Sequence, residues 1–111
     1  MKSSYAGAPY QLSMGKLVRD RIPEIIRREG RSPAVERIGG ELLRRALKDK
    51  LVEEALELRE AEDIRDELAD VLEVADALMA AYEADPADVR ARQQEKRRER
   101  GGFEEGYYLN E

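Results

Sequence analysis

Two pairs of carboxylates lie on the apolar faces of two neighbouring predicted helices. On a helix over about 41–59, with about 3.6 residues per turn, Glu54 and Glu57 fall inside the leucine stripe. On the next helix Glu67 lies within the apolar face and Asp70 at its edge. Carboxylates are rarely buried without a partner, and surface helices usually carry their acids on the opposite side. The two pairs therefore predict a shared partner between the helices.

The apolar stripes repeat every three or four residues along both segments. The first segment has Leu43, Leu47, Leu51 and Leu58, and the second has Ile64, Leu68, Val71, Ala75, Leu78 and Met79. Such stripes are buried when one helix packs against another. We expect an all-α fold, an antiparallel helical bundle of about four helices with a short irregular or strand-like C-terminal tail.

A turn between the two helices would bring the carboxylates together. Glu57 and Glu67 are each five positions from Glu62, and Glu54 and Asp70 are each eight positions from it. An antiparallel hairpin that turns near Glu62 therefore sets the pairs level. Gathered carboxylates repel one another strongly in a low dielectric, and a hard divalent cation removes that repulsion. Because all-oxygen ligation suits magnesium or manganese, the four acids predict a Mg²⁺ site, with Mn²⁺ as the alternative.

Two alternatives leave the acids without a metal. The chain is 41% charged, and charged side chains usually lie on solvated faces. No Gly or Pro marks the turn, although Asp63 is a candidate N-cap for the second helix. A helix that ran unbroken from 41 to 83 would separate Glu57 and Glu67 by ~15 Å, too far to share a metal. The metal site therefore depends on the hairpin.

Composition limits the chemistry that this chain can perform. Its 111 residues are enough for one domain with a modest core. It has no Cys and no His, which excludes thiolate nucleophiles and cysteine zinc sites and removes the commonest general base. Catalysis must therefore rest on carboxylates, a metal, and Lys or Arg. No apolar run approaches the ~20 residues of a membrane span, and no signal peptide is visible, so we expect a cytoplasmic protein without a membrane partner.

The charges are separated along the chain, which carries a net charge of −5. Residues 49–88 contain 15 acids and three bases. Residues 16–31 contain six bases and three acids, and residues 90–100 contain six bases and two acids. The middle segment is therefore suited to cations, and both flanking segments are suited to phosphates.

Turn and cap residues divide the chain into elements. Residues 1–13 are polar and aperiodic, so we expect a flexible N-terminal tail followed by one helical domain over 14–111. Asp20 is a candidate N-cap for a short helix with Pro23 in its first turn, which ends near Gly30. The last helix is expected to begin at Asp85-Pro86 and to end at Gly101-Gly102. Because this helix is mostly polar, it should dock weakly or project.

A second apolar face is predicted on the helix that carries Glu54. Val52, Ala55 and Leu56 point away from the leucine stripe. A helix that is apolar on two sides is buried on two sides. The cover is either another copy of the chain, in a homodimer or higher homo-oligomer, or the first or last helix of the same chain.

The motifs resemble those of one enzyme family. Its signature of E-E-x-x-E followed by E-x-x-D corresponds here to Glu53-Glu54-Ala-Leu-Glu57 and Glu67-Leu-Ala-Asp70. The opening KLVRDRIPEII and the K-x-x-x-R-G-G-F stretch from Lys96 to Phe103 extend the match to about residues 14–109. The chain is thus similar to the MazG-like branch of the all-α nucleoside triphosphate pyrophosphohydrolases. That superfamily includes phosphoribosyl-ATP pyrophosphohydrolase, but no Tyr-His follows Asp70 here.

This resemblance implies an activity and a set of roles. Glu54, Glu57, Glu67 and Asp70 would ligate Mg²⁺ while water attacks the α-phosphorus of a nucleoside triphosphate, giving a nucleoside monophosphate and pyrophosphate. Glu54 would thereby also be catalytic, and Glu53 would position the water or bind a further metal, unless it is a rim charge. The biological role would include house-cleaning of modified nucleotides.

Six basic residues are candidates for substrate binding. They are Lys50, Lys16, Arg19, Arg21, Lys96 and Arg100. Arg is favoured for bidentate contacts with phosphate oxygens. Lys50 lies one turn before Glu54, so it either contacts phosphate or offsets the acids as an i,i+4 partner. The other five either reach the site or belong to solvated basic faces.

Two other functions compete with hydrolysis of a nucleoside triphosphate. One is a non-catalytic helical oligomerisation or interaction module that uses the second apolar face and the basic last helix. The other is phosphoribosyl-ATP pyrophosphohydrolase activity. No nucleic-acid partner is expected, because the overall charge is negative and the tail aromatics lie in no recognised nucleic-acid-reading pattern.

Overall fold

The computed structural model describes residues 15–111. The expected tail over residues 1–13 lies outside the described residues. Four α-helices follow one another: α1 (Ile22–Arg28), α2 (Gly40–Glu60), α3 (Arg65–Ala81) and α4 (Pro86–Arg100). The described part of the chain contains no strand, and it has bends and turns after Arg100. The predicted all-α fold of about four helices is therefore confirmed.

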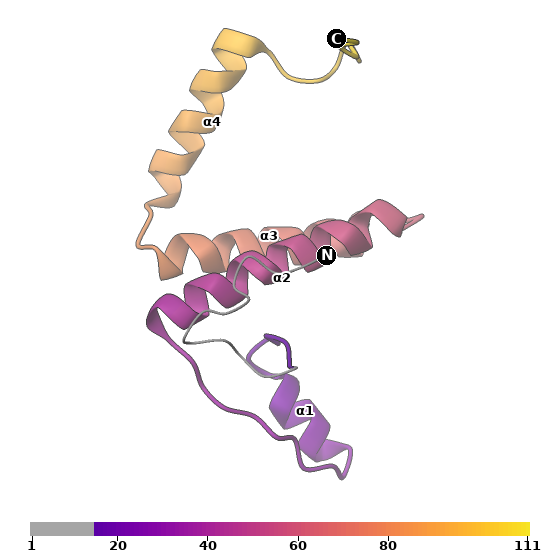
Figure 1. The fold of residues 1–111 in the computed structure, drawn as a ribbon, viewed down its shortest axis with the longest axis vertical. Helices are drawn as coiled ribbons and strands as arrows, with labels where there is room; N and C mark the ends of the chain where they lie inside the picture. Colours follow the sequence, from indigo (N-terminus) through magenta and orange to yellow (C-terminus); the bar gives the residue numbers. More distant parts are fainter. Residues whose placement is uncertain (1–14) are drawn as a thin grey trace.

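Helices α2 and α3 form an antiparallel hairpin (Figure 1). The chain leaves helical geometry at Ala61, which is extended, and α3 begins after Ile64. The predicted turn near Glu62 is therefore confirmed. The expected N-cap at Asp63 is shifted by one residue, because Ile64 takes the cap position. The carboxylate of Asp63 still accepts a hydrogen bond from the Arg65 backbone N–H at 3.1 Å, which satisfies one free donor of the first turn.

The hairpin holds the small apolar core. Ala46 and Leu47 of α2 and Val74 of α3 are the buried apolar residues of the described chain. The predicted apolar face of α3 was partly wrong, because Ile64 and Leu68 are 49% and 40% exposed, whereas Val74 was not predicted. Helix α3 carries apolar residues around more than half of its circumference. The side with Val74 packs against α2, and the side with Leu68 remains uncovered.

Helix α1 lies below the hairpin in Figure 1. Pro23 stands in its first turn as predicted. The expected N-cap at Asp20 was wrong, since Arg21 takes the cap position and no side chain caps the helix. Residues 17–21, which lead into α1, pass along one side of the hairpin, and this segment supplies side chains to the cavity described below.

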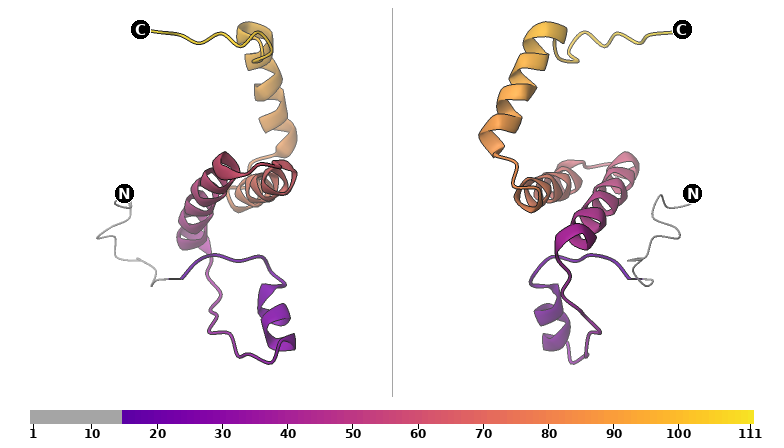
Figure 2. Two further views of the ribbon diagram at one scale, coloured as in Figure 1. Left: turned by 90° about the vertical axis from the view of Figure 1, so that its right-hand side faces the viewer. Right: turned by 60° about the vertical axis from the view of Figure 1, so that its left-hand side comes forward.

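Helix α4 projects from the end of the hairpin (Figures 1 and 2). After α3, Glu83 has a φ of 53° and the Ala84 N–H donates to the Met79 carbonyl at 2.8 Å, the arrangement of a Schellman helix end. Asp85 then caps α4 by accepting from the Ala87 N–H at 2.9 Å. These local bonds set the direction in which α4 departs. The structure confirms that α4 starts at Asp85-Pro86 and ends at Gly101. It also confirms that this helix projects (Figure 1).

None of the helices within residues 15–111 combines the length and the apolar character needed to cross a bilayer.

Candidate functional site

The hairpin brings carboxylates of α2 and α3 together. Oxygen atoms of Glu54, Glu67 and Asp70 lie within 4.8 Å of one another. Oxygen atoms of Glu53, Glu54 and Glu57 form a second group of the same size. Glu54 belongs to both groups and is the link between them. The four predicted metal ligands thus form two overlapping groups instead of one, because the exposed Glu57 is gathered with its own helix neighbours.

Glu54 is the deepest of these acids. Its residue is 6% exposed, and its Oε2 atom makes no hydrogen bond within the described chain. Burial raises the pKa of Glu54 above its ordinary value, and the nearby carboxylates of Glu57 and Asp70 raise it further. Lys50 opposes this shift but does not cancel it. A buried carboxylate oxygen without a donor, facing two more acids, is the chemistry of an oxygen site for a hard cation.

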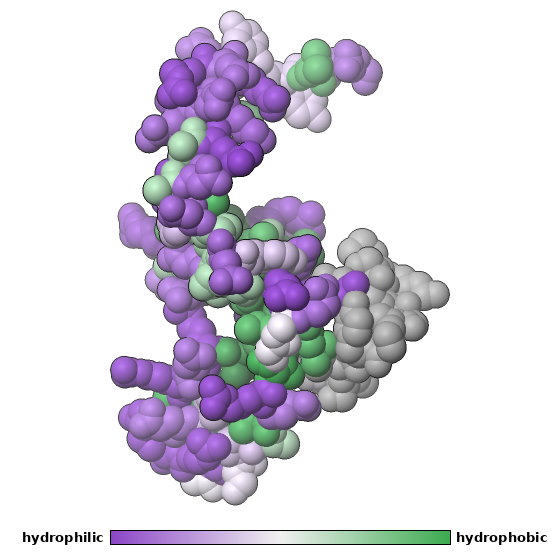
Figure 3. Space-filling model, turned by 90° about the vertical axis from the view of Figure 1, so that its left-hand side faces the viewer, coloured by the Kyte–Doolittle hydropathy of each residue, from purple (hydrophilic) through white to green (hydrophobic). Residues whose placement is uncertain are grey.

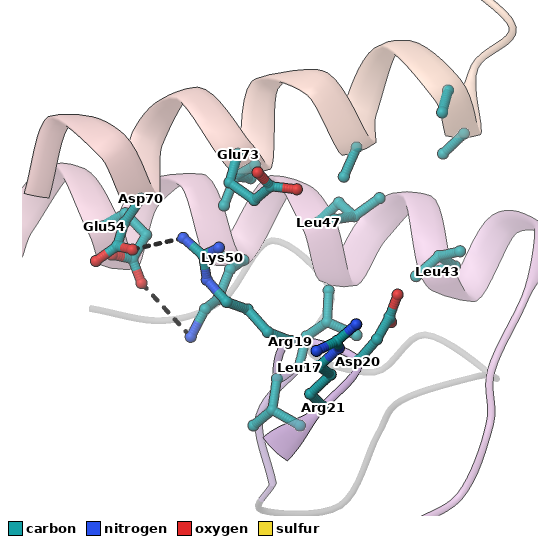
Figure 4. Close-up of a pocket in the computed structure, with 15 residues that line it drawn as sticks. Leu17, Arg19, Asp20, Arg21, Leu43, Leu47, Lys50, Glu54, Asp70 and Glu73 are labelled. Carbon is teal, nitrogen blue, oxygen red and sulfur yellow. Dashed lines mark hydrogen bonds and ion pairs between the residues drawn. The ribbon is translucent and has the colours of Figure 1, made fainter. Parts of the chain in front are cut away.

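Two cations already contact the acids. Lys50 Nζ lies 3.3 Å from Glu53 Oε2 and 3.6 Å from Glu54 Oε1, so it is an ion-pair partner within the site. The Arg19 guanidinium donates to Asp70 Oδ1 at 2.6 Å, although the two residues are 51 positions apart in the chain. Figure 4 shows Arg19 reaching Asp70 from the segment before α1 and Lys50 reaching Glu54 from α2.

A cavity of about 690 Å³ opens beside the acids. Glu54, Asp70, Lys50 and Arg19 are among its lining residues, and the predicted Arg21 lines it beside Leu17 and Asp20, away from the acids (Figure 4). The remaining lining is mainly apolar and comes from Leu17, Val18, Leu43, Leu47, Val74, Ala77, Ala80 and Ala81. In Figure 3 the apolar surface gathers between the hairpin and the segment around α1. A largely apolar lining with a few charged side chains is typical of sites for small organic ligands.

Three predicted basic residues are not brought to this cavity. Lys16 is exposed and is not among the lining residues, although Leu17 after it is. Lys96 and Arg100 lie toward the far end of α4, which points away from the hairpin (Figure 2). Within one copy of the chain, these two residues are therefore absent from the acid site.

Other residues of the cavity were not predicted from the sequence. Glu73 adds a further carboxylate to the lining, and it lies one turn after Asp70. The i,i+3 spacing from Asp70 was the available signal. Ala77, Ala80 and Ala81 form the small-residue wall of the cavity. Their short side chains leave the space that a run of leucines would have filled.

The second apolar face of α2 is uncovered in a single chain. Val52 and Leu56 are 50% and 48% exposed. The alternative in which α1 or α4 covers this face was therefore wrong. Both helices stand clear of the hairpin, since α2 with α3 is the main packed pair of elements in the described chain.

Replacing Glu54 by Gln should stabilise the metal-free protein at neutral pH. The folded-state pKa of Glu54 is raised, so its contribution to stability is present below the unfolded pKa and is lost as pH rises through the folded pKa. Gln removes the charge that burial opposes. We expect a gain of about 1 kcal/mol and a Tm higher by ~4–8 °C in chelator at pH 7.

A pH series of thermal melts in chelator measures this effect. The difference between the variant and the wild type should shrink toward acidic pH, where wild-type Glu54 is protonated. Glu60→Gln is the matched control on the same helix, because Glu60 is exposed. A lower Tm for Glu54→Gln at neutral pH would contradict the assigned cost of the buried charge.

Comparisons with known proteins give little further information. No family model matches the chain, and no solved structure is similar to it. Over 53 residues the chain is 51% identical to a protein of Mycolicibacterium smegmatis that is described as uncharacterized. The match covers 48% of this chain and 53% of that protein, so it spans about half the length of each. The site geometry therefore carries the functional argument.

Proposed function

We propose that this protein is a Mg²⁺-dependent pyrophosphohydrolase of nucleoside triphosphates. The observation that carries the proposal is the buried Glu54 oxygen without a hydrogen-bond donor, which is gathered with Glu67 and Asp70, while Glu54 and Asp70 also line a cavity. The resemblance of the E-E-x-x-E and E-x-x-D motifs to MazG-like enzymes supports the same activity. The products would be a nucleoside monophosphate and pyrophosphate.

The donor set fits a hard divalent cation. Glu54, Glu67 and Asp70 would hold Mg²⁺, and Glu53 and Glu57 are available in the second group that shares Glu54. Mn²⁺ suits the same carboxylate ligands. When bound, the metal would screen the charge of the triphosphate and lower the pKa of water.

The chain's own residues would orient the reactants. Glu53 is half-buried beside Glu54 and is held by Lys50 at 3.3 Å. We propose that its carboxylate orients the attacking water and takes up one of its protons. The water oxygen bonds to the α-phosphorus while the bond from that phosphorus to the bridging oxygen breaks. The departing pyrophosphate keeps the bridging oxygen and its electron pair.

The cations around the cavity would bind the phosphate chain. Arg19, Arg21 and Lys50 are lining residues of the cavity. Arg19 is paired with Asp70 and Lys50 with Glu54, so substrate and metal would replace these ion pairs. Arg suits bidentate contacts with phosphate oxygens. The apolar lining residues, such as Leu43 and Ala77, would then contact the nucleoside.

The setting of the enzyme is part of the proposal. We propose a cytoplasmic homo-oligomer, a dimer as the smallest form, because the exposed Val52 and Leu56 remain uncovered in one chain. The same exposed face also favours the second candidate function, a non-catalytic helical interaction module. An interaction module would not require a metal, so dependence on Mg²⁺ distinguishes the hydrolase from it.

A nucleotide panel tests the activity directly. The protein is mixed with Mg²⁺ and with each of a set of common and modified nucleoside triphosphates, and pyrophosphate release is measured. We expect release from at least one nucleotide with kcat in the range of about 1–10³ s⁻¹, and loss of release in EDTA. Phosphoribosyl-ATP is included in the same panel, and pyrophosphate release from it alone would favour phosphoribosyl-ATP pyrophosphohydrolase activity. Absence of release from every compound would reject the proposed function.

A further inference from the structure

We propose that Arg19 is a metal-sensitive latch. Its ion pair with Asp70 fastens segment 17–21 to the hairpin, and a divalent cation bound by the acids releases that segment. Arg19 is thus a positioning residue for the wall of the cavity before a substrate binds. The response to metal rests on the proposed function, whereas the fastening of segment 17–21 by Asp70 does not.

The part of the chain before α2 packs loosely on the hairpin. No residue from 15 to 39 is buried, including those of α1. The ion pairs of α1 and of the loop after it join residues at most four positions apart, so they do not reach the hairpin. Within the described chain, the attachment of this region therefore depends on few contacts.

Segment 17–21 supplies such contacts. Leu17 and Val18 are half-buried and line the cavity. The guanidinium of Arg19 then donates to Asp70 Oδ1 at 2.6 Å (Figure 4). The side chains of Arg19 and Asp70 are 55% and 38% exposed, and an exposed ion pair changes an equilibrium by no more than about fivefold. A pair this weak can be broken and formed again.

A divalent cation would compete with Arg19 for the same carboxylate. Asp70 belongs with Glu54 and Glu67 to the group whose oxygen atoms lie within 4.8 Å of one another. The double charge of the cation attracts each carboxylate about twice as strongly as a guanidinium does at equal distance. A guanidinium that stayed on Asp70 would also face a like charge at close range. Metal binding therefore favours release of Arg19.

A polyphosphate would fasten the segment again. Arg binds phosphate oxygens with two parallel hydrogen bonds, and Mg²⁺ commonly binds substrate phosphates. A polyphosphate held by the cation would therefore offer Arg19 a new anionic partner beside the acids. Segment 17–21 would be closed without metal, open with metal alone, and closed again with metal and polyphosphate.

Calorimetric titration with Mg²⁺ alone tests the competition. Arg19→Met removes the guanidinium and keeps a long side chain, and we expect its Kd for Mg²⁺ to be about twofold to fivefold lower than that of the wild type. Arg19→Lys keeps the charge and should bind Mg²⁺ as the wild type does. Arg28→Met is the matched control at an exposed arginine of α1. An unchanged or higher Kd for Arg19→Met would overturn the inference, because a residue that supports a metal ligand weakens metal binding when it is lost.

Distances between two spin labels test the fastening. The chain has no Cys, so Arg27→Cys on α1 and Asp76→Cys on α3 place one label on each part of the full-length protein. In chelator we expect a narrow distance distribution, which should broaden toward longer distances when Asp70→Asn or Arg19→Met is added. Asp66→Asn is the matched control at an exposed position of α3. Mg²⁺ should broaden the distribution without these substitutions, and inorganic triphosphate added with Mg²⁺ should narrow it again.

The outcomes separate this inference from the proposed function. A distribution that Asp70→Asn leaves unchanged in chelator would overturn the fastening, and one that Mg²⁺ leaves unchanged would overturn the release. Neither measurement requires turnover. A segment that responds to Mg²⁺ in a protein that releases no pyrophosphate would support the latch and reject the hydrolase. Pyrophosphate release with an unresponsive segment would do the reverse.

Discussion

Glu54→Gln and Asp70→Asn are each expected to reduce pyrophosphate release by more than about 100-fold, while the helical fold is retained. Both carboxylates belong to the group that also contains Glu67, and each change replaces a charged oxygen with an amide. Loss of residues that merely support metal ligands already costs about 10–100-fold, so loss of a ligand should cost more. Steady-state kinetics at saturating Mg²⁺ measure the effect, and circular dichroism measures the fold.

Matched substitutions on the same helices provide the controls. Glu60→Gln on α2 and Asp76→Asn on α3 make the same chemical changes at exposed positions outside both carboxylate groups. These variants should keep release within about twofold, because surface substitutions away from a site usually have small effects. Full activity in either Glu54→Gln or Asp70→Asn would refute the metal-ligand assignment.

Mg²⁺ is expected to raise the Tm of the wild-type protein by about 10–20 °C at a concentration 100-fold above its Kd. A ligand that binds only the folded state adds about 2.7 kcal/mol at that ratio, and for a domain of this size 1 kcal/mol shifts Tm by ~4–8 °C. The gain should fall at acidic pH, where the raised pKa of Glu54 keeps that carboxyl protonated and unable to bind metal.

The Glu54→Gln variant distinguishes site binding from general salt effects. In chelator its Tm should be higher than that of the wild type. Because Mg²⁺ should raise the Tm of the variant only slightly, the wild type should have the higher Tm once metal is added. Ca²⁺ and Mn²⁺ titrations show how selective the site is. An equal Mg²⁺ response in both proteins, or none in the wild type, would favour the interaction module over the hydrolase.

The sequence by itself determined the helices and the turn between them. Periodic leucines predicted α2, and the symmetry of Glu57 and Glu67 about Glu62 predicted where the chain reverses. Asp85-Pro86 predicted the start of α4. Composition alone excluded Cys and His chemistry. These features depend on residues close together in the chain, where helical periodicity and capping act.

The tertiary structure decided which side of each helix faces its neighbour. Val74 is buried and Leu68 is exposed. Because α3 has apolar residues on several sides, its sequence did not determine which of them would be buried. The tertiary structure also made Glu54 the common member of two carboxylate groups and brought Arg19 to Asp70 across 51 positions. Such contacts depend on the angle at which helices cross and on how a distant segment packs beside them. A periodic pattern in one segment carries no information about either, so burial and long-range ion pairs emerged only in three dimensions.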